Sequence, residues 1–281
     1  PMALLASEAG WRALYLAGGL AALLMTALLV LVDRDEFRPQ RRRSAADPGP
    51  ALAAGLTNPD DVPVAVALRR IFGLRQTWPP FFAYLGLYTP HLAFSGLWGI
   101  DWLMSVHGAS EGAAATILLL FSAGAVIMPP AAAWLEVRIG SRTRMLGLSA
   151  LVTAGAWAAL AALNGLKPPL IVVALLVVLI GTSSFAFVVT YAVVKELHPP
   201  SLLGLATGIQ NMAGFLGGML WQPIAGWILD QYTVAAASAG GSAVAPAGYT
   251  VVLWLSAALA ATGWLGALAM RESTAARHQA A

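Results

Sequence analysis

The sequence predicts an all-α membrane protein with seven transmembrane helices. Hydrophobic residues make up 59% of the 281 residues and charged residues only 10%, whereas a soluble domain carries roughly 25% charged residues. Apolar stretches of about 20 residues recur along the chain, and each is long enough, at ~1.5 Å per residue, to cross the ~30 Å hydrocarbon layer of a bilayer. This composition excludes secreted, disordered and nucleic-acid-binding proteins, so no nucleic-acid partner is expected.

Seven stretches satisfy this length requirement. In chain order they cover residues 13–32, 78–103, 113–135, 145–163, 169–194, 204–229 and 250–270. They divide the chain into an outer loop with the first helix, a cytoplasmic linker, a six-helix bundle and a cytoplasmic tail, at residues 1–32, 33–77, 78–270 and 271–281. The lipid bilayer is therefore the first expected partner.

The positions of Lys and Arg predict the orientation of the chain. Of the 16 basic residues, only Arg12 and Lys167 fall outside the loops and the tail that follow the odd-numbered spans. Short loops rich in Lys and Arg stay in the cytoplasm. We therefore expect a multi-pass protein of the plasma (inner) membrane with its C-terminus in the cytoplasm.

The linker at residues 33–77 is the only long hydrophilic stretch. Its first part, which contains Arg41, Arg42 and Arg43, has no periodicity and is typical of a tether. In its second part Val64, Leu68 and Ile71 recur at helical spacing, which predicts a short amphipathic helix lying along the membrane. The linker either tethers two parts of the chain or also regulates them.

One face of the second span carries an aromatic and polar stripe, at residues spaced 4, 3, 4, 3 and 4 apart: Tyr84, Tyr88, His91, Ser95, Trp98 and Trp102. Polar groups facing lipid would lack hydrogen-bond partners. The stripe therefore lines a solute cavity, with His91 as a proton carrier, or it packs against neighbouring helices. Pro90 is expected to bend the helix beside His91.

The sixth span repeats the pattern. Asn211, Gly214 and Gln222 fall on one side, with Gln210 adjacent, and Gly214 and Gly218 form a G-x-x-x-G pair that lets another helix approach closely. The fifth span offers Thr182, Ser183, Ser184 and Tyr191. These side chains either contact a ligand or, in the case of the Ser and Thr hydroxyl groups, bond back to their own helix.

Several kinds of chemistry are absent from the sequence. No Asp or Glu lies near the middle of a span. Asp101 belongs to the second span but falls near its outer end. The chain has no Cys, and its four His residues are scattered, so no metal site and no cofactor are expected. The string GASEG at residues 108–112 lacks the preceding strand that a nucleophile elbow requires.

Four segments resemble one family of membrane transporters. They are PPSLLGLATG at residues 199–208, QPIAGWILD at 222–230, GWR at 10–12 and SGLWG at 95–99. They are similar to segments around the eleventh, sixth and seventh helices of the major facilitator superfamily. Residues 136–144 read EVRIGSRTR, a stretched copy of the loop signature of that family, and the resemblance assigns a gating loop to Glu136, Arg138, Gly140 and Arg142.

The resemblance implies that the chain is N-terminally truncated and comprises the sixth helix and the C-terminal six-helix half of a transporter. The missing N-terminal half is then a partner, and the chain alone is not expected to transport. Such transporters work by alternating access around a site at the membrane midplane. The stripes fall on helices that face the cavity in this family, which assigns to the substrate pathway Tyr84, Tyr88, His91, Ser95, Trp98, Ser184, Gln210, Asn211 and Gln222.

We therefore expect a secondary active transporter of a small organic solute, driven by a proton or solute gradient, and not an enzyme. An alternative is an intramembrane hydrolase with Ser183 or Ser184 as nucleophile and His91 as base, which requires the two side chains to lie within hydrogen-bond reach. A second alternative is a membrane scaffold, which a dry, fully packed stripe would favour.

Overall fold

The structure, a computed structural model, describes residues 16, 19–20, 22–28, 63–235 and 242–270. The chain divides into two compact units, Pro1–Asn58 and Pro59–Ala281. The described residues of the first unit are helical. The predicted first span, residues 13–32, lies largely outside the described residues, as do the first part of the linker and the tail.

Five helical segments of the described chain are long and apolar enough to cross a membrane. They are Glu111–Ile139, Arg142–Leu166, Leu170–Leu197, Pro200–Gln231 and Pro246–Ala269. Each overlaps one predicted span, and the all-α membrane class is confirmed. The total of seven spans stays a prediction.

The bounds of the long helices follow from local signals. The helices are α6 (Glu111–Ile139), α7 (Arg142–Leu163), α8 (Leu170–Ser184), α9 (Val189–Leu197), α10 (Leu203–Gln231) and α11 (Pro246–Ala269). The hydroxyl groups of Ser110 and Ser141 accept hydrogen bonds from backbone N–H groups in the first turns of α6 and α7, which is the usual N-cap arrangement. Short 3₁₀ turns join several helices, at Arg75–Thr77, Asn164–Leu166, Phe185–Val188 and Pro200–Leu202.

The predicted second span is helical throughout but in three pieces. An α-helix, α4 (Trp78–Ala93), is followed by a π-helical turn at Phe94–Trp98 and by α5 (Gly99–Ser105). A π turn inserts an extra residue into the helical ladder and rotates the residues after it relative to those before it. The face that begins at Tyr84 is therefore not continued straight through this turn.

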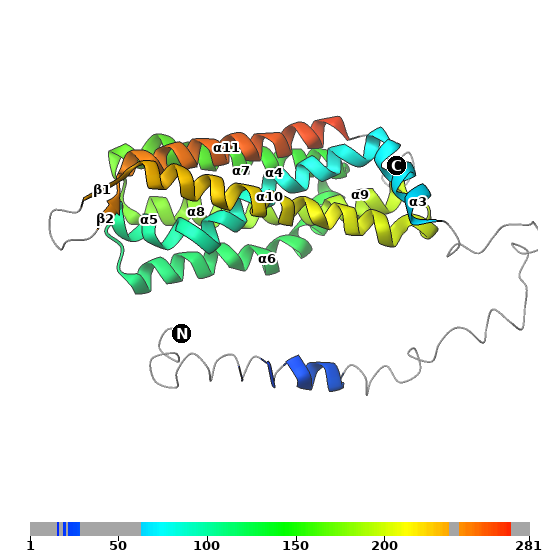
Figure 1. The fold of residues 1–281 in the computed structure, drawn as a ribbon, viewed down its shortest axis with the longest axis horizontal. Coiled ribbons are helices and arrows are strands. Elements are labelled where there is room, and N and C mark those ends of the chain that lie inside the picture. The colour runs from blue at the N-terminus through cyan, green and yellow to red at the C-terminus, as the bar shows by residue number, and fades with distance from the viewer. Residues whose placement is uncertain (1–15, 17–18, 21, 29–62, 236–241, 271–281) are drawn as a thin grey trace, which may run out of the picture. The chain divides into compact units, whose positions relative to one another are not determined.

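The long helices of the second unit lie side by side along a common direction (Figure 1). Helix α11 packs against both α4 and α7, α10 packs against α4, and α8 packs against both α6 and α7. One end of this bundle carries α3 (Val64–Gly73), and we call it the α3 end. The other carries a hairpin of two short strands, and we call it the hairpin end.

The helix α3 lies where the sequence places an amphipathic helix. Its buried side chains, Ala67 and Ile71, pack against Val194 of α9 and against Leu202 and Ala206 at the start of α10. Val64, in contrast, is exposed. The apolar side of α3 therefore covers the α3 end of the bundle.

The hairpin between α10 and α11 was not expected from the sequence. Strands β1 (Thr233–Ala235) and β2 (Ser242–Val244) pair antiparallel, with Thr233 opposite Val244. Each strand has three residues, which is too short for a periodic pattern to be visible in the sequence.

The interior near the hairpin end is rich in aromatic rings, including those of Phe94, Trp98, Trp102 and Trp157. The indole N–H of Trp102 donates to Asn164 Oδ1 at 2.8 Å, and the amide of Asn164 donates to Pro246 O and Thr250 Oγ1. Asn164, in the turn after α7, thus links α5 to α11, whereas the buried indole N–H groups of Trp98 and Trp157 have no hydrogen-bond partner among the described residues. Large apolar side chains also point outward, with Val126 of α6 77% exposed, as expected of a surface in contact with lipid.

Candidate functional site

Aromatic rings from α4, from the turn Phe185–Val188 and from α9 meet in the part of the bundle nearer the α3 end. Tyr84 and Tyr88 lie one turn apart on α4, with ring centroids 5.5 Å apart. Phe187 stacks on Tyr84 at 4.2 Å, and the ring of Tyr191 lies 5.8 Å from that of Tyr84. The Tyr191 hydroxyl donates to Asn211 Oδ1 of α10 at 2.7 Å. We call Tyr84, Tyr88, Phe187, Tyr191 and Asn211 the tyrosine face.

The close approach of α10 to α4 depends on small residues. A Cβ atom on Gly214 would lie 2.7 Å from Tyr84 Cζ and 2.7 Å from Tyr88 Cδ1, and one on Gly218 would run into Leu92. The G-x-x-x-G pair therefore faces α4, and its second glycine contacts an apolar side chain. Asn211, less than one turn before Gly214, is left exposed beside this contact.

His91 and Ser184 form a buried pair. His91 Nδ1 lies 3.0 Å from Ser184 Oγ, and the Ser184 hydroxyl donates to Gly181 O at 3.1 Å. The Ser184 hydroxyl therefore lies within hydrogen-bond distance of both Gly181 O and His91 Nδ1, and the tautomer of the imidazole decides which atom donates in the His91–Ser184 pair. The imidazole is 5% exposed, stacked on Phe121 at 4.1 Å and flanked by Phe185 at 4.8 Å.

The helix changes its geometry next to this pair. Pro90 has no N–H to donate within α4, and the π-helical turn begins four residues later at Phe94. The Ser95 hydroxyl donates to His91 O at 3.0 Å and to Leu92 O at 3.3 Å, so it bonds back to its own helix. Ser95 itself is half-buried.

The π-helical turn takes the end of the stripe into the interior. Trp98 is 2% exposed and packs edge-on against Phe94 at 4.9 Å, with Trp157 at 6.2 Å. Trp102 is fully buried. The expectation that one continuous face carries all six stripe residues is therefore corrected, since the extra residue of the π turn rotates Trp98 and Trp102 away from Tyr84 and His91.

The two glutamines of α10 have different surroundings. Gln210 is 2% exposed, and its amide donates to Pro80 O at 2.9 Å and to Thr190 Oγ1 at 2.8 Å. Gln210 therefore connects α10 to α4 and α9 by hydrogen bonds and is buried between the three helices. Gln222 is half-buried, and its Nε2 atom lies 3.7 Å from where a Cβ on Gly96 would be.

A charged cluster joins three helices at the α3 end. Arg142, the first residue of α7, pairs with Glu136 of α6 at 2.6 Å and with Glu196 of α9 at 2.6 Å. Gly140 has a φ of +64°, which is the left-handed conformation that ends many helices. Arg138 instead lies over the Trp134 ring, 4.4 Å from its centroid. Three of the four residues assigned to the gating loop thus shape one ion-pair cluster or its turn.

The family model for the Major Facilitator Superfamily matches residues 2–221 and again residues 80–280. The chain belongs to the Major Facilitator Superfamily. Its resemblance to that family is thereby confirmed, and the protein is a multi-pass membrane protein of a transporter family. None of the curated proteins compared with the chain matches it.

This chain of the Major Facilitator Superfamily uses residues that the sequence did not single out. Phe187 stacks on Tyr84 in the tyrosine face, and Glu196 is the second partner of Arg142. Tyr191, which the sequence did offer as a polar residue of the fifth span, completes the tyrosine face through its hydrogen bond to Asn211. Within residues 63–235 and 242–270, no three His, Asp or Glu side chains gather closely enough to hold a metal ion.

Proposed function

We propose that this chain forms one wall of the solute pathway of a secondary active transporter that moves a small organic solute by alternating access. The observation that carries the proposal is the hydrogen bond of Tyr191 to Asn211, two polar side chains within long apolar helical segments of a membrane protein, of which Asn211 is exposed. The tyrosine face is the centre of the proposed pathway.

The physical reason is the cost of polar groups in hydrocarbon. Asn211 Oδ1 accepts the hydrogen bond from Tyr191. The N–H groups of the same amide would lack a partner in lipid, at a cost of a few kcal/mol. The exposed side of Asn211 therefore faces water, solute or another polypeptide. We propose that an N-terminal half of the same transporter supplies the opposite wall and encloses the aqueous pathway between the two halves.

The chemistry of the tyrosine face favours a particular class of solute. Its phenol, amide and aromatic groups carry no formal charge, and no Asp or Glu occurs near the middle of the surrounding helices. Such a surface suits a neutral or zwitterionic, partly apolar solute, held by hydrogen bonds and ring contacts. A proton or solute gradient drives the transport, and His91, next to Tyr88 in the same aromatic group, is the proposed proton carrier.

The ion pairs of Arg142 support a role in gating. They connect the ends of α6 and α9 to the start of α7. Breaking them would remove the charged contacts between these helix ends, including the one to α9, which carries Tyr191. We propose that this cluster stabilises one of the two access states.

A test of the proposal is solute uptake by membrane vesicles. Vesicles containing this chain and the N-terminal half, loaded with a proton or solute gradient, are expected to accumulate members of a panel of labelled neutral and zwitterionic solutes. Asn211→Leu should abolish accumulation, whereas Leu151→Ala on α7 should not, because Leu151 is an exposed apolar residue at similar depth. Uptake by vesicles with the chain alone would contradict the two-wall proposal, and equal uptake by Asn211→Leu and wild type would contradict the proposed pathway.

One observation favours an intramembrane hydrolase as a second candidate. The 3.0 Å separation of His91 Nδ1 and Ser184 Oγ meets the hydrogen-bond requirement for a nucleophile and its base. Against it, Ser184 is fully buried, so a substrate has no access to its hydroxyl, and the same hydroxyl also lies within hydrogen-bond distance of Gly181 O. Labelling of wild type by a fluorophosphonate probe, lost in Ser184→Ala and kept in Ser183→Ala, would support the hydrolase over the transporter.

The membrane-scaffold alternative requires the polar side chains of the second and sixth spans to be buried against neighbouring helices. Trp98 and Gln210 are packed in the interior, as that alternative requires. Asn211 and the half-buried Tyr88, Ser95 and Tyr191 are not, and they are the reason for favouring a transporter.

A further inference from the structure

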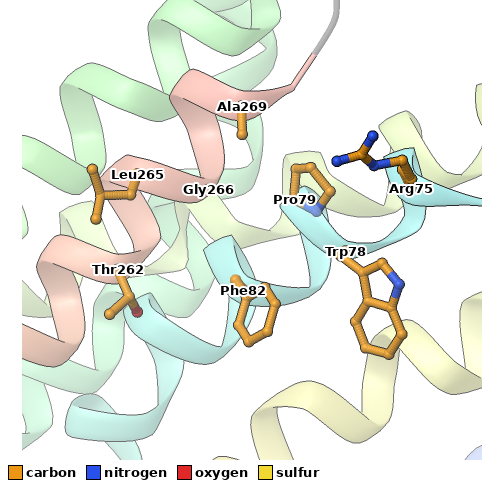
Figure 2. A pocket seen from close by; sticks show the side chains of 8 residues that line it. All are labelled: Arg75, Trp78, Pro79, Phe82, Thr262, Leu265, Gly266 and Ala269. Carbon is orange, nitrogen blue, oxygen red and sulfur yellow. The ribbon is translucent and has the colours of Figure 1, made fainter.

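A groove runs between α4 and α11 at the α3 end of the bundle (Figure 2). Its volume is about 470 Å³. The residues that shape it come from the turn before α4, from α4 itself and from α11: Arg75, Trp78, Pro79, Phe82, Leu265 and Ala269. The groove is distinct from the tyrosine face, because none of its lining residues belongs to that set.

The floor of the groove is formed by two helices whose backbones touch. A Cβ on Gly266 would lie 2.7 Å from Pro79 O and 2.8 Å from Ala83 N, so α11 lies directly against α4 at this glycine. The walls are apolar, since Phe82 is 47% and Leu265 58% exposed. In a membrane protein such exposed apolar side chains face hydrocarbon, and the acyl chain of a lipid is the apolar group that contacts them.

The mouth of the groove is polar and positively charged. Figure 2 shows the guanidinium of Arg75 extending over Pro79 toward the end of α11. Arg75 is exposed, and among the described residues it has no ion-pair partner. The indole N–H of Trp78 donates to Phe72 O at 3.2 Å, which fixes a tryptophan at the border of the apolar part, where membrane proteins are enriched in this residue.

A second hollow, of about 710 Å³, continues from the mouth. It is lined by the turn at Gly73, Leu74 and Gln76, and it shares Arg75, Pro79 and Ala269 with the groove. The apolar groove and this second hollow, which Gln76 also lines, therefore meet at Arg75. The apolar groove, Arg75 and the second hollow follow one another in the same order as the acyl chain, the phosphate and the headgroup of a phospholipid.

We propose that this groove binds an anionic phospholipid, with the lipid phosphate on Arg75 and one acyl chain between Phe82 and Leu265. Basic pockets between transmembrane helices are suited to anionic headgroups. The guanidinium supplies several donors in a planar fork that matches phosphate oxygens. This site is independent of the proposed transport role, since it needs only that the protein lies in a membrane.

The test is a lipid titration of the purified full chain in detergent, read by native mass spectrometry. Wild type should bind dioleoylphosphatidylglycerol more tightly than dioleoylphosphatidylcholine. Arg75→Gln should weaken binding of the anionic lipid about tenfold, the effect of losing one charge-assisted hydrogen-bonded contact. Arg70→Gln is the matched control, because Arg70 is also an exposed arginine but does not line the groove, and it should leave the affinity unchanged.

A second variant and a competition experiment test whether the lipid occupies the groove. Ala269→Trp places a large side chain where the two hollows meet and should also weaken binding of the anionic lipid. Inorganic phosphate at the same ionic strength should not displace the lipid, because it lacks the acyl chain. Equal affinities for the two lipids, equal effects of Arg75→Gln and Arg70→Gln, unchanged binding by Ala269→Trp, or displacement by phosphate would overturn the proposal.

Discussion

Replacing Gly214 by alanine tests how closely α10 packs on α4 behind the tyrosine face. The added Cβ would lie 2.7 Å from both Tyr84 Cζ and Tyr88 Cδ1, whereas nonbonded carbon atoms are most stable about 3.5–4.0 Å apart. Each ring must therefore move by about 1 Å, or α10 must move away from α4. Such overpacking costs about 1–3 kcal/mol.

The replacement also has a favourable effect. Alanine within a helix is more stable than glycine by about 0.5–1 kcal/mol, so Gly214→Ala should lower the free energy of unfolding by about 1 kcal/mol in total, and by no more than about 2.5 kcal/mol. Gly208→Ala is the matched control on the same helix. No atom lies within 4 Å of a Cβ on Gly208, and this variant should raise the free energy of unfolding by about 0.5–1 kcal/mol.

The assay is reversible unfolding of the purified full chain in mixed micelles of a mild detergent and dodecyl sulfate, followed by circular dichroism. The two variants should shift the midpoint in opposite directions. If Gly214→Ala and Gly208→Ala stabilise the chain alike, α10 does not contact the tyrosine rings as described, and the geometry of the tyrosine face is refuted.

Three further predictions concern charged and titratable groups. Arg142→Gln removes the ion-pair partner that Glu136 and Glu196 share and should lower the free energy of unfolding by about 1–2 kcal/mol; in a double-mutant cycle with Glu196→Gln, the loss in the double variant should be smaller than the sum of the two single losses, and full additivity would contradict the ion pair. His91→Ala should abolish the dependence of uptake on a pH gradient while solute exchange continues; an unchanged pH dependence would remove His91 from the coupling mechanism. Burial lowers the pKa of His198, so at a pH near the ordinary pKa of histidine the unfolded chain binds more protons than the folded chain. The free energy of unfolding should therefore fall as the pH falls from 7.5 to 5. His198→Gln should flatten this pH dependence in unfolding measurements, and an equal slope in the variant and wild type would contradict the role of His198.

The helical architecture could be predicted because its signal is long and repeated. The stretch at 113–135 corresponds to α6 and the stretch at 204–229 to α10, each within a few residues. Twenty apolar residues in succession leave few alternatives to a spanning helix. The hairpin at 233–244 gives no comparable signal, because three-residue strands are too short for periodicity to identify.

Single side chains were harder to place, and Trp98 shows the reason. Uniform helical spacing aligns Trp98 with Tyr84 and His91, but the π-helical turn at Phe94–Trp98 changes the rotation between them. Periodicity assumes one constant helical repeat. A sequence therefore cannot show on which side of such a turn the alignment ends.

The surroundings of the two neighbouring amides on α10 were a second feature that the sequence could not predict. Gln210 and Asn211 are adjacent and chemically alike, yet Gln210 is committed to Pro80 and Thr190, whereas Asn211 is exposed and bonded to Tyr191. Their partners belong to helices distant in sequence. Which amide is free to meet a solute is decided by the packing of α4, α9 and α10.

The absence of cysteine from the chain makes the accessibility of Asn211 directly measurable. Single cysteines at Asn211 and at Leu151, which lie at similar depths on α10 and α7, can be treated in membranes with a charged, water-soluble maleimide. Water beside the tyrosine face predicts rapid modification of Asn211→Cys and none of Leu151→Cys, because Leu151 faces lipid. Protection of both cysteines, or equal modification of both, would contradict a hydrated pathway along α4 and α10.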